Sequence, residues 1–405
     1  MAKIDELLQE LCPDGVEWKT IKELFETRNG YTPSTKNSSF WTNGDIPWFK
    51  MEDIRDKGHI LSDAYSHITK SALKGKGLFK ANSIILATSA TIGEHALITV
   101  DHLSNQRFTN IYPKEKWVNK IHMKFVYYYM YLIDEWCKTH VKQGSFAAVD
   151  MDGFYKQEIP IPPLSIQQEI VEVLDTFTDA ISNLEEELAL REKQFEYYRE
   201  QLLAFDDEDI DKAELSSISD IKGRIGFRGY TRNDIVDKGA GAISLSPSNI
   251  VDGMLHFENS TYISWEKYEE SPEIKASEGQ IVLTKTGSTV GKVALIKYLP
   301  EPCTINPQLV LITCTTFNSA YLNYVLQSFS MQSEIKRLAG IGAVPNISQK
   351  LLGKIIVPIP SSERQQEIVE ILDTFEAMIA NIKEEIALRT KQYEYYREKL
   401  LSFGK

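Results

Sequence analysis

The chain has 405 residues, 42% of them hydrophobic and 25% charged, which is the composition of an ordinary globular protein with room for two or three domains. No apolar run approaches the roughly 18 residues that suggest a membrane-spanning helix, and the first residues lack the apolar core of a signal peptide. The four cysteines lie far apart and include no C-x-x-C pair. This usage argues against a zinc site or a disulfide framework and predicts a cytoplasmic protein.

The net charge of −12 is concentrated in one segment. Residues 159–214 contain 16 acidic and 4 basic side chains, and this difference of 12 equals the deficit of the whole chain. Because local patches rather than the total charge set the affinity for phosphate, the net charge neither supports nor excludes binding to nucleic acid. Within the acidic segment we expect Glu185, Glu186 and Glu187 to face a protein partner, the alternative being a merely solvated face.

The first segment, residues 1–158, predicts a mixed α/β domain. A buried strand at 84–86 is followed by a turn rich in glycine and hydroxyl groups at 88–93 and by a second strand at 96–98. Further along, the aromatic-rich stretch 125–133 is most simply a core helix, although a base-stacking platform is an alternative.

Residues 159–205 predict one long helix. Prolines at 160, 162 and 163 prevent a helix upstream, and Ser165 with Gln168 has the pattern of a capping box. A helix of about 38 residues would be roughly 57 Å long. Its apolar side follows alternating steps of four and three, as in a coiled coil. The positions of this seam are Ile170, Leu174, Phe177, Ile181, Leu184, Leu188, Arg191, Phe195, Tyr198 and Leu202.

An acidic linker is predicted at 206–214, and the segment 215–356 then repeats the order of the first domain. A strand at 281–283, a turn at 286–291 and a strand at 294–296 parallel the elements at 84–98. The stretch 321–326 is again most simply a core helix. The sequence therefore predicts two similar mixed α/β domains.

Residues 357–405 predict a second long helix that copies the first. Residues 159–205 return at 357–403 with 30 of 47 positions identical, and such a repeat indicates two copies of one structural unit. Ser362 with Gln365 repeats the predicted capping box. The second seam consists of Ile368, Leu372, Phe375, Ile379, Ile382, Ile386, Arg389, Tyr393, Tyr396 and Leu400.

Each seam contains one charged residue, Arg191 in the first copy and Arg389 in the second. A charge in a seam lowers stability but fixes register and partner. Two matched helices in one chain can satisfy each other as an antiparallel pair. The predicted fold class is therefore α+β, with two similar mixed α/β domains separated by two long helices that pack as an antiparallel coiled coil.

No motif predicts a catalytic centre. The stretch 287–293 resembles a phosphate-binding loop, but only three residues separate its glycines and Val293 replaces the magnesium-binding hydroxyl. The segment 13–19 is too short to place a nuclease carboxylate set on two strands. Asn306-Pro307-Gln308 lacks the second proline and the aromatic residue of an amino-methyltransferase loop. We therefore expect no metal and no cofactor on this chain.

The glycine-rich turns between strands could instead contact DNA. Exposed backbone N–H groups and polar side chains beside such turns can meet phosphates or base edges, although a plain β-turn is the alternative. The candidate DNA-binding residues are Lys50, Ser89, Thr91, Gln106 and Arg107 in the first domain and Arg232, Asn249, Lys285, Ser288, Thr289, Lys292 and Gln308 in the second.

The repeated residues resemble the specificity (S) subunit of type I restriction–modification enzymes. The resemblance covers essentially the whole chain. It is carried by the Pro-x-Pro entries, Gln-Gln-Glu-Ile at 167–170 and 365–368, Leu-Asp-x-Phe at 174–177 and 372–375, and the Lys-Gln-aromatic-Glu-Tyr-Tyr-Arg ends at 193–199 and 391–397. The opening at 14–19 also matches, but it has no clear counterpart after Phe205.

The resemblance implies two target-recognition domains, 1–158 and 215–356, held by conserved spacer helices at 159–205 and 357–405. Each domain would read one half of a split double-stranded DNA sequence, and the helices would set the gap. Two modification (M) subunits that use S-adenosylmethionine to methylate adenine would dock on this chain. ATP-dependent restriction (R) subunits, which need Mg²⁺, would join them in some complexes.

Two other classes of function remain open at this point. An enzyme acting directly on DNA would need a cofactor motif that the sequence does not contain. A coiled-coil scaffold protein would show no preference for any DNA sequence.

Overall fold

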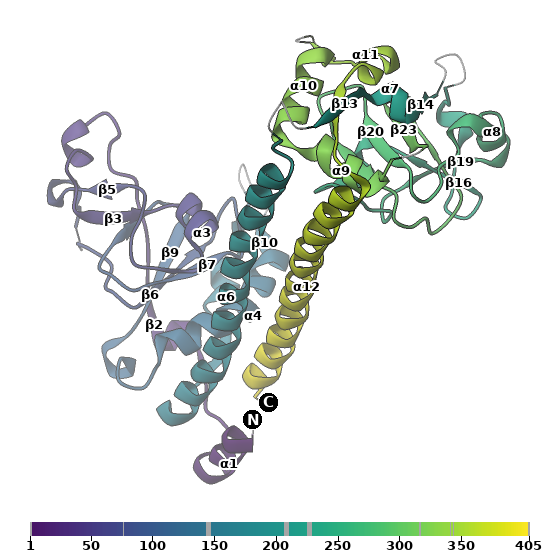
Figure 1. The fold of residues 1–405 in the computed structure, drawn as a ribbon. Helices are drawn as coiled ribbons and strands as arrows, with labels where there is room; N and C mark the ends of the chain where they lie inside the picture. Colours follow the sequence, from purple (N-terminus) through teal and green to yellow (C-terminus); the bar gives the residue numbers. More distant parts are fainter. Residues whose placement is uncertain are drawn as a thin grey trace. The chain divides into compact units, whose positions relative to one another are not determined.

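The computed structural model describes residues 2–403 except 76, 143–146, 206–209, 225–228, 316, 341 and 343. The acidic run 206–209 therefore lies outside the described residues. The chain divides into two compact units, unit 1 with Met1–Leu184 and Glu385–Lys405, and unit 2 with Glu185–Glu384. The long helices α6 (Leu164–Leu202) and α12 (Ser362–Leu401) contain 39 and 40 residues, and each contributes one part to each unit (Figure 1).

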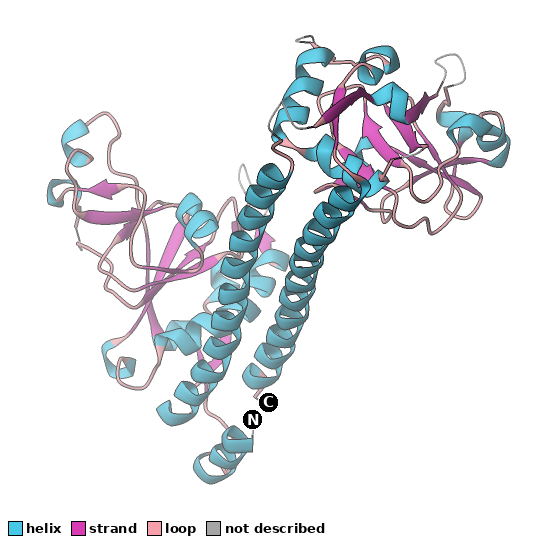
Figure 2. Ribbon diagram, viewed as in Figure 1, coloured by secondary structure: helices cyan, strands magenta, loops and turns pink. Residues whose placement is uncertain are grey.

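Unit 1 contains a five-stranded sheet in the order β2-β9-β6-β7-β4 and a three-stranded sheet in the order β5-β3-β8. The strands of both units are drawn in magenta in Figure 2. Strands β3 and β8 run parallel, and the strands of the pair β6–β9 are antiparallel. The strands are β1 (Trp18–Thr20), β2 (Phe25–Asn29), β3 (Ile46–Phe49), β4 (Ile60–Leu61), β5 (His67–Ile68), β6 (Ser83–Ala87), β7 (His95–Ile98), β8 (Leu103–Ser104), β9 (Phe108–Pro113), β10 (Val141–Lys142), β11 (Ala148–Val149) and β12 (Glu158–Pro160). The helices of this unit besides α6 and α12 are α1 (Ala2–Leu11), α2 (Ile21–Leu24), α3 (Met51–Lys57), α4 (Met123–Thr139) and α5 (Met151–Phe154).

Unit 2 repeats this arrangement with a sheet in the order β14-β23-β20-β21 and another in the order β15-β19-β16-β22. Strands β16 and β22 run parallel, as β3 and β8 do in unit 1. The strands are β13 (Asp211–Glu214), β14 (Ser219–Gly223), β15 (Ile235–Val236), β16 (Gly241–Leu245), β17 (Ile250–Val251), β18 (Met254–Leu255), β19 (Thr261–Ser264), β20 (Ile281–Thr284), β21 (Val293–Leu295), β22 (Cys303–Ile305), β23 (Leu309–Cys314) and β24 (Ile356–Ile359). The helices are α7 (Leu215–Ile218), α8 (Trp265–Glu269), α9 (Ser319–Gln327), α10 (Phe329–Ala339) and α11 (Gln349–Gly353).

The duplication therefore extends beyond the helices into both globular parts, as the sequence predicts. A short strand pair closes the base of each part, β1 with β12 in unit 1 and β13 with β24 in unit 2. Strand β13 is formed by residues 211–214, which belong to the predicted acidic linker. It is the counterpart of the opening strand at 18–20, for which no sequence match was found. Backbone pairing with β24 forms this strand although its side chains differ.

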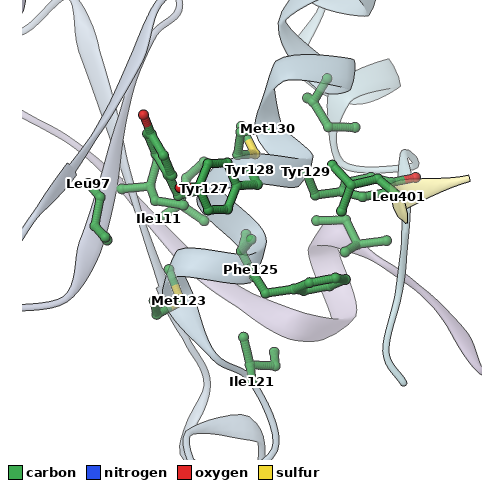
Figure 3. Packing of buried hydrophobic residues seen from close by; sticks show 14 of the residues in the cluster. Leu97, Ile111, Ile121, Met123, Phe125, Tyr127, Tyr128, Tyr129, Met130 and Leu401 are labelled. Atoms are coloured by element: carbon green, nitrogen blue, oxygen red, sulfur yellow. The ribbon is translucent and has the colours of Figure 1, made fainter. Parts of the chain in front are cut away.

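The core of unit 1 is built around helix α4. Figure 3 shows Phe125, Tyr127, Tyr128 and Tyr129 of α4 in one core with Leu401 from the end of α12, and all five side chains are buried. In unit 2 the side chains of Tyr321 and Tyr324 on α9 are likewise almost inaccessible. The aromatic stretches at 125–133 and 321–326 are thus core helices rather than base-stacking platforms.

Each unit contains the beginning of one long helix and the end of the other. In unit 1 the rings of Phe177 on α6 and Tyr396 on α12 stack with centroids 5.2 Å apart. In unit 2 the rings of Phe375 on α12 and Tyr198 on α6 stack at 5.3 Å. Each Leu-Asp-x-Phe phenylalanine thus meets the second tyrosine of the other copy's Tyr-Tyr pair. A start-to-end contact of this kind in both units means that the helices run antiparallel.

The predicted capping boxes are not formed. Helix α6 begins at Leu164, one residue before Ser165, and Gln168 donates to Glu172 at 3.3 Å instead of to the helix start. In the second copy Ser361, not Ser362, receives the N–H of Arg364 at 3.2 Å. The main-chain carbonyls of Pro163 and Ser361 accept the first helical N–H groups, so each helix starts earlier than the hydroxyl pattern indicated.

A buried glutamine at the start of each long helix joins the helix to its unit. Gln167 donates to the carbonyl of Pro162 at 2.7 Å and accepts the N–H of His122, the residue before α4, at 2.8 Å. Gln365 donates to the carbonyl of Pro360 at 2.9 Å and accepts the N–H of Asn318, the residue before α9, at 3.4 Å. The Gln-Gln-Glu-Ile motif therefore fixes the angle at which each long helix leaves its domain.

The seam arginines bond along their own helices. Arg191 contacts Glu187 at 3.4 Å, and Arg389 contacts Glu385 at 2.7 Å. Both guanidinium groups are more than a third exposed, so these i,i+4 pairs contribute little to stability.

A tyrosine of each core helix donates to the aspartate of the Leu-Asp-x-Phe motif. Tyr128 bonds to Asp175 at 2.5 Å, and Tyr324 bonds to Asp373 at 2.7 Å. Burial raises the pKa of both phenols far above the ordinary value, so they remain protonated donors at neutral pH. Together with the buried glutamines, these bonds hold core helix and long helix together in the same way in both units.

We expect Tyr324→Phe to lower the free energy of unfolding by about 1 kcal/mol, because one hydrogen bond is lost while the ring stays in the core and Asp373 can bind water. The urea midpoint of the purified chain measures this change. Tyr298→Phe is the matched control, because Tyr298 is 62% exposed. Equal midpoints for the two variants would show that the bond to Asp373 does not stabilise unit 2.

Candidate nucleic-acid interface

The strands of unit 1 bring several loops to one edge, which we call the rim of unit 1 (residues 88–93 and 105–107). The loop at 105 begins where the parallel strands β3 and β8 both end, and the Asn105 N–H donates to the Phe49 carbonyl at 3.0 Å. The loop at 88 follows β6, and the Thr88 N–H donates to the Arg107 carbonyl at 3.0 Å. The two loops are therefore joined by main-chain bonds.

The rim of unit 2 (residues 285–292 and 306–308) is built in the same way. The Asn306 N–H donates to the Leu245 carbonyl at the end of β16 at 2.8 Å, and the Lys285 N–H donates to the Gln308 carbonyl at 2.8 Å. Gly287 has a φ of +106°, and a Cβ placed there would lie 3.3 Å from Nε2 of Gln308. A glycine at this point therefore leaves room for the Gln308 side chain.

Four of the sequence candidates lie exposed on these rims. They are Gln106 and Arg107 in unit 1 and Ser288 and Gln308 in unit 2. The hydroxyl of Thr32 donates to the side-chain oxygen of Gln106 and so orients its amide.

Four further candidates are half-buried at or beside the rims: Lys50, Ser89, Lys285 and Thr289. Lys50 directly follows β3, and a hydrogen bond to Glu52 raises the pKa of its ammonium, which stays charged. These side chains are accessible to a ligand at the rim surface, but each is partly covered by other residues of the protein.

Asn249 and Thr91 turn their polar groups into the protein, which argues against contact with a ligand, whereas Lys292 is exposed but also bonds within the protein. Asn249 is buried, and its amide donates to the His256 carbonyl at 2.9 Å and accepts the Ser246 N–H at 2.9 Å. The Lys292 ammonium donates to the Ile250 carbonyl at 2.9 Å. The Thr91 hydroxyl is buried without a hydrogen-bond partner among the described residues. Sequence alone could not show which way these side chains turn.

Arg232 is exposed but does not belong to the rim. It precedes β15, which is antiparallel to β19, which in turn is antiparallel to β16. Strands β15 and β16 therefore run in the same direction and begin at the same end of the sheet, whereas the rim lies at the end where β16 stops. Arg232 is thus at the end of the sheet opposite the rim.

Two residues that shape the rims are not among the sequence candidates. Asn105 and Asn306 each accept, through Oδ1, the N–H of the residue two positions later, both at 2.9 Å. The signal was an asparagine two residues before a candidate, since asparagine commonly bonds the backbone in such turns. In the sequence, Asn306 stands out only as part of an incomplete methyltransferase motif.

Among the described residues no group of three or more His, Cys, Asp or Glu side chains could hold a metal ion. In the same part of the chain, no helix is both long enough and apolar enough to cross a membrane. The chemistry available at the rims is therefore hydrogen bonding by amide, hydroxyl, guanidinium and ammonium groups.

Comparison with known proteins identifies relatives of both halves of the chain. The family described as the type I restriction modification DNA specificity domain matches residues 13–191 and again 218–388. The specificity subunit of the type I restriction enzyme EcoprrI from Escherichia coli is 35% identical over 93% of this chain and 92% of its own length. The EcoR124I/EcoR124II specificity subunit, also from E. coli, is 31% identical over 71% of this chain and 72% of its own length.

Solved structures share the fold. A crystal structure of a type I restriction–modification S subunit from M. genitalium superimposes with a TM-score of 0.57 at 16% identity, covering 96% of this chain and 97% of that chain. A chain from a study of complex assembly in the type I restriction–modification system superimposes with a TM-score of 0.62 at 18% identity over the same shares. The α+β fold class predicted from sequence is confirmed.

We expect Asn249→Ala to lower the free energy of unfolding by about 1–3 kcal/mol, because the Ser246 N–H and the His256 carbonyl lose a buried partner. The urea midpoint again measures the change. Asn233→Ala is the matched control, since Asn233 is exposed. If Asn249→Ala unfolded at the control's urea concentration, the interpretation of Asn249 as a structural residue would be wrong.

Proposed function

Because the chain belongs to the DNA specificity subunits of type I restriction–modification enzymes, we propose that each of its units reads one half of a split DNA sequence through its rim. The observation that carries this proposal is the match of the specificity family to both halves of the chain, together with the equivalent rim in each unit. A coiled-coil scaffold without DNA specificity is not favoured by these relatives.

The rims have the chemistry that base reading needs. Base edges are recognised by side chains that can form two hydrogen bonds to one base at once, whereas phosphates are held by charges, polar side chains and main-chain N–H groups. Gln106, Arg107 and Gln308 are of the first kind, and Lys50 and Lys285 of the second. Ser288 adds an exposed hydroxyl, which can donate to a base edge or accept from one.

Methyl transfer and DNA cleavage would belong to partner subunits. In the proposed complex two modification subunits bind this chain, carry S-adenosylmethionine and methylate adenine, and restriction subunits supply ATP-dependent cleavage. The duplicated helices offer each modification subunit an equivalent surface. Glu185, Glu186 and Glu187 are exposed on α6, where phosphate would be repelled and a basic protein surface attracted.

An exchange of the second target-recognition domain tests whether each domain reads its half of the DNA sequence independently of the other. Replacing residues 215–355 with the matching segment of a relative keeps strands β13 and β24, which pair at the base of unit 2. We expect one half of the methylated sequence to change and the other half to stay, as read by methylome sequencing of cells that express the chain with its modification subunit. A change in both halves, or in neither, would contradict modular reading.

A second test asks whether the helices set the gap between the two halves. We propose inserting seven residues in α6 between Leu184 and Glu185 and seven in α12 between Glu384 and Glu385, where the units meet in the sequence. Each insertion adds about 10 Å of helix, which corresponds to about three base pairs of DNA. We expect a longer gap with both half-sites unchanged.

The matched control replaces seven residues at the same points without changing the length of either helix. A gap of unchanged length in the lengthened variant would show that the helices do not act as the ruler, even if both half-sites are still read.

A further inference from the structure

We propose that Arg107 and Gln308 are equivalent base-reading residues, which recognise a guanine in the half-site read by unit 1 and an adenine in the half-site read by unit 2. This inference rests on the proposed function, because it assigns roles within the rims that are proposed to read DNA. It adds a chemical identity to one base in each half-site.

The two residues occupy the same position of the same turn. In unit 1 the side chain of Asn105 accepts the N–H of Arg107, and in unit 2 the side chain of Asn306 accepts the N–H of Gln308, both at 2.9 Å. The N–H of the next residue then closes each turn on the asparagine carbonyl, at 3.3 Å in unit 1 and 3.1 Å in unit 2. The asparagine side chain thus shapes each turn through a main-chain N–H group. The shape of the turn therefore does not depend on which side chain stands two positions later.

Main-chain bonds anchor both turns to the neighbouring loop. The carbonyl of Arg107 accepts the Thr88 N–H, and the carbonyl of Gln308 accepts the Lys285 N–H. None of these bonds uses the side chain of residue 107 or 308. The position can therefore change its side chain while the backbone that presents it stays in place.

Both side chains point out of the protein although buried strands follow directly. Arg107 and Gln308 are exposed, whereas Phe108 and Leu309, the first residues of β9 and β23, are fully buried. Within the described part of the chain the Arg107 guanidinium makes no hydrogen bond or ion pair. The Gln308 side-chain oxygen accepts from Asn306 at 3.2 Å, which orients the amide and leaves a lone pair and the NH₂ group for a ligand.

The side chains at this position match different bases. A guanidinium donates to both O6 and N7 of guanine, whereas a glutamine amide accepts from N6 and donates to N7 of adenine. A phosphate oxygen only accepts hydrogen bonds, so it could use the NH₂ group of Gln308 but not its side-chain oxygen. The edge of adenine uses both groups of the amide. Gln308 is neutral, so the shared property of the two residues is bidentate hydrogen bonding rather than charge.

The experiment exchanges the two side chains in the complex of this chain with its modification subunit. Arg107→Gln and Gln308→Arg are measured for binding to a library of duplexes that varies every position of both half-sites. We expect Arg107→Gln to turn a guanine preference into an adenine preference at one position of one half-site, and Gln308→Arg to do the reverse in the other half-site. The expected change in preference is about 10- to 100-fold.

Lys22→Gln and Lys238→Gln are matched controls, since both lysines are exposed and lie outside the rims. Neither control should alter any base preference. Arg107→Ala is the second variant, which removes the exposed side chain and should relax one position only. It keeps the inference testable if Arg107→Gln does not assemble.

Uniform weakening by Arg107→Gln or Arg107→Ala across all sequences would overturn the inference, because a phosphate contact behaves in that way. The inference would also be overturned if the wild-type motif did not combine a guanine in one half-site with an adenine in the other half-site. If the wild-type complex showed no sequence preference at all, the proposed function itself would fail, and this outcome is distinguishable from the other two.

Discussion

Each unit of this protein depends on a helix end that the other copy of the repeat supplies. The stacks of Phe177 on Tyr396 and of Phe375 on Tyr198 join the start of one long helix to the end of the other. Tyr393, Leu400 and Leu401 of α12 are buried in the core of unit 1. Because burying large side chains is the main stabilising term of a domain, neither repeat can complete a core by itself. The retained identity of the helices follows from this mutual requirement.

The same constraint explains where the chain is free to vary. The buried glutamines and the tyrosine–aspartate bonds use motif residues, and their geometry repeats in both units. The rims are fixed differently, by main-chain hydrogen bonds and one asparagine per turn. Side chains that take no part in holding the backbone can be replaced without loss of the fold. The protein thus separates a frame that resists substitution from turns that tolerate it.

Periodicity and repetition predicted most of the fold, because they reflect backbone geometry that many residues share. The long helices, the two mixed domains and the core helices at 125–133 and 321–326 follow from such patterns. The predicted capping boxes failed because Pro163 and Ser361 begin the helices earlier than Ser165 and Ser362 suggest. Strand β13 was missed because main-chain pairing with β24, not its own residue types, forms it.

The candidate site was harder to predict, because exposure depends on how a side chain turns. Residue type and loop position point to Asn249 and Lys292 as readily as to Gln308, yet Asn249 accepts the N–H of Ser246 and the Lys292 ammonium donates to the carbonyl of Ile250. Arg232 has the polar side chain and turn position of a candidate, but the strand directions place it at the end of the sheet opposite the rim. What distinguishes these residues is tertiary contact, which a single sequence does not contain.

The two units differ in how the chain is divided between them, and this affects the order in which they can fold. Unit 2 is a continuous stretch, whereas unit 1 needs residues 385–403 to cover the core that residues 2–184 begin. During synthesis from the N-terminus, the first domain to leave the ribosome is therefore the last to be completed. The apolar side chains of its part of α6 stay uncovered until some 200 further residues have been synthesised. A chain that stops within the final helix would leave unit 1 with an open core, so a truncated product becomes a target for proteolysis rather than a partly competent reader.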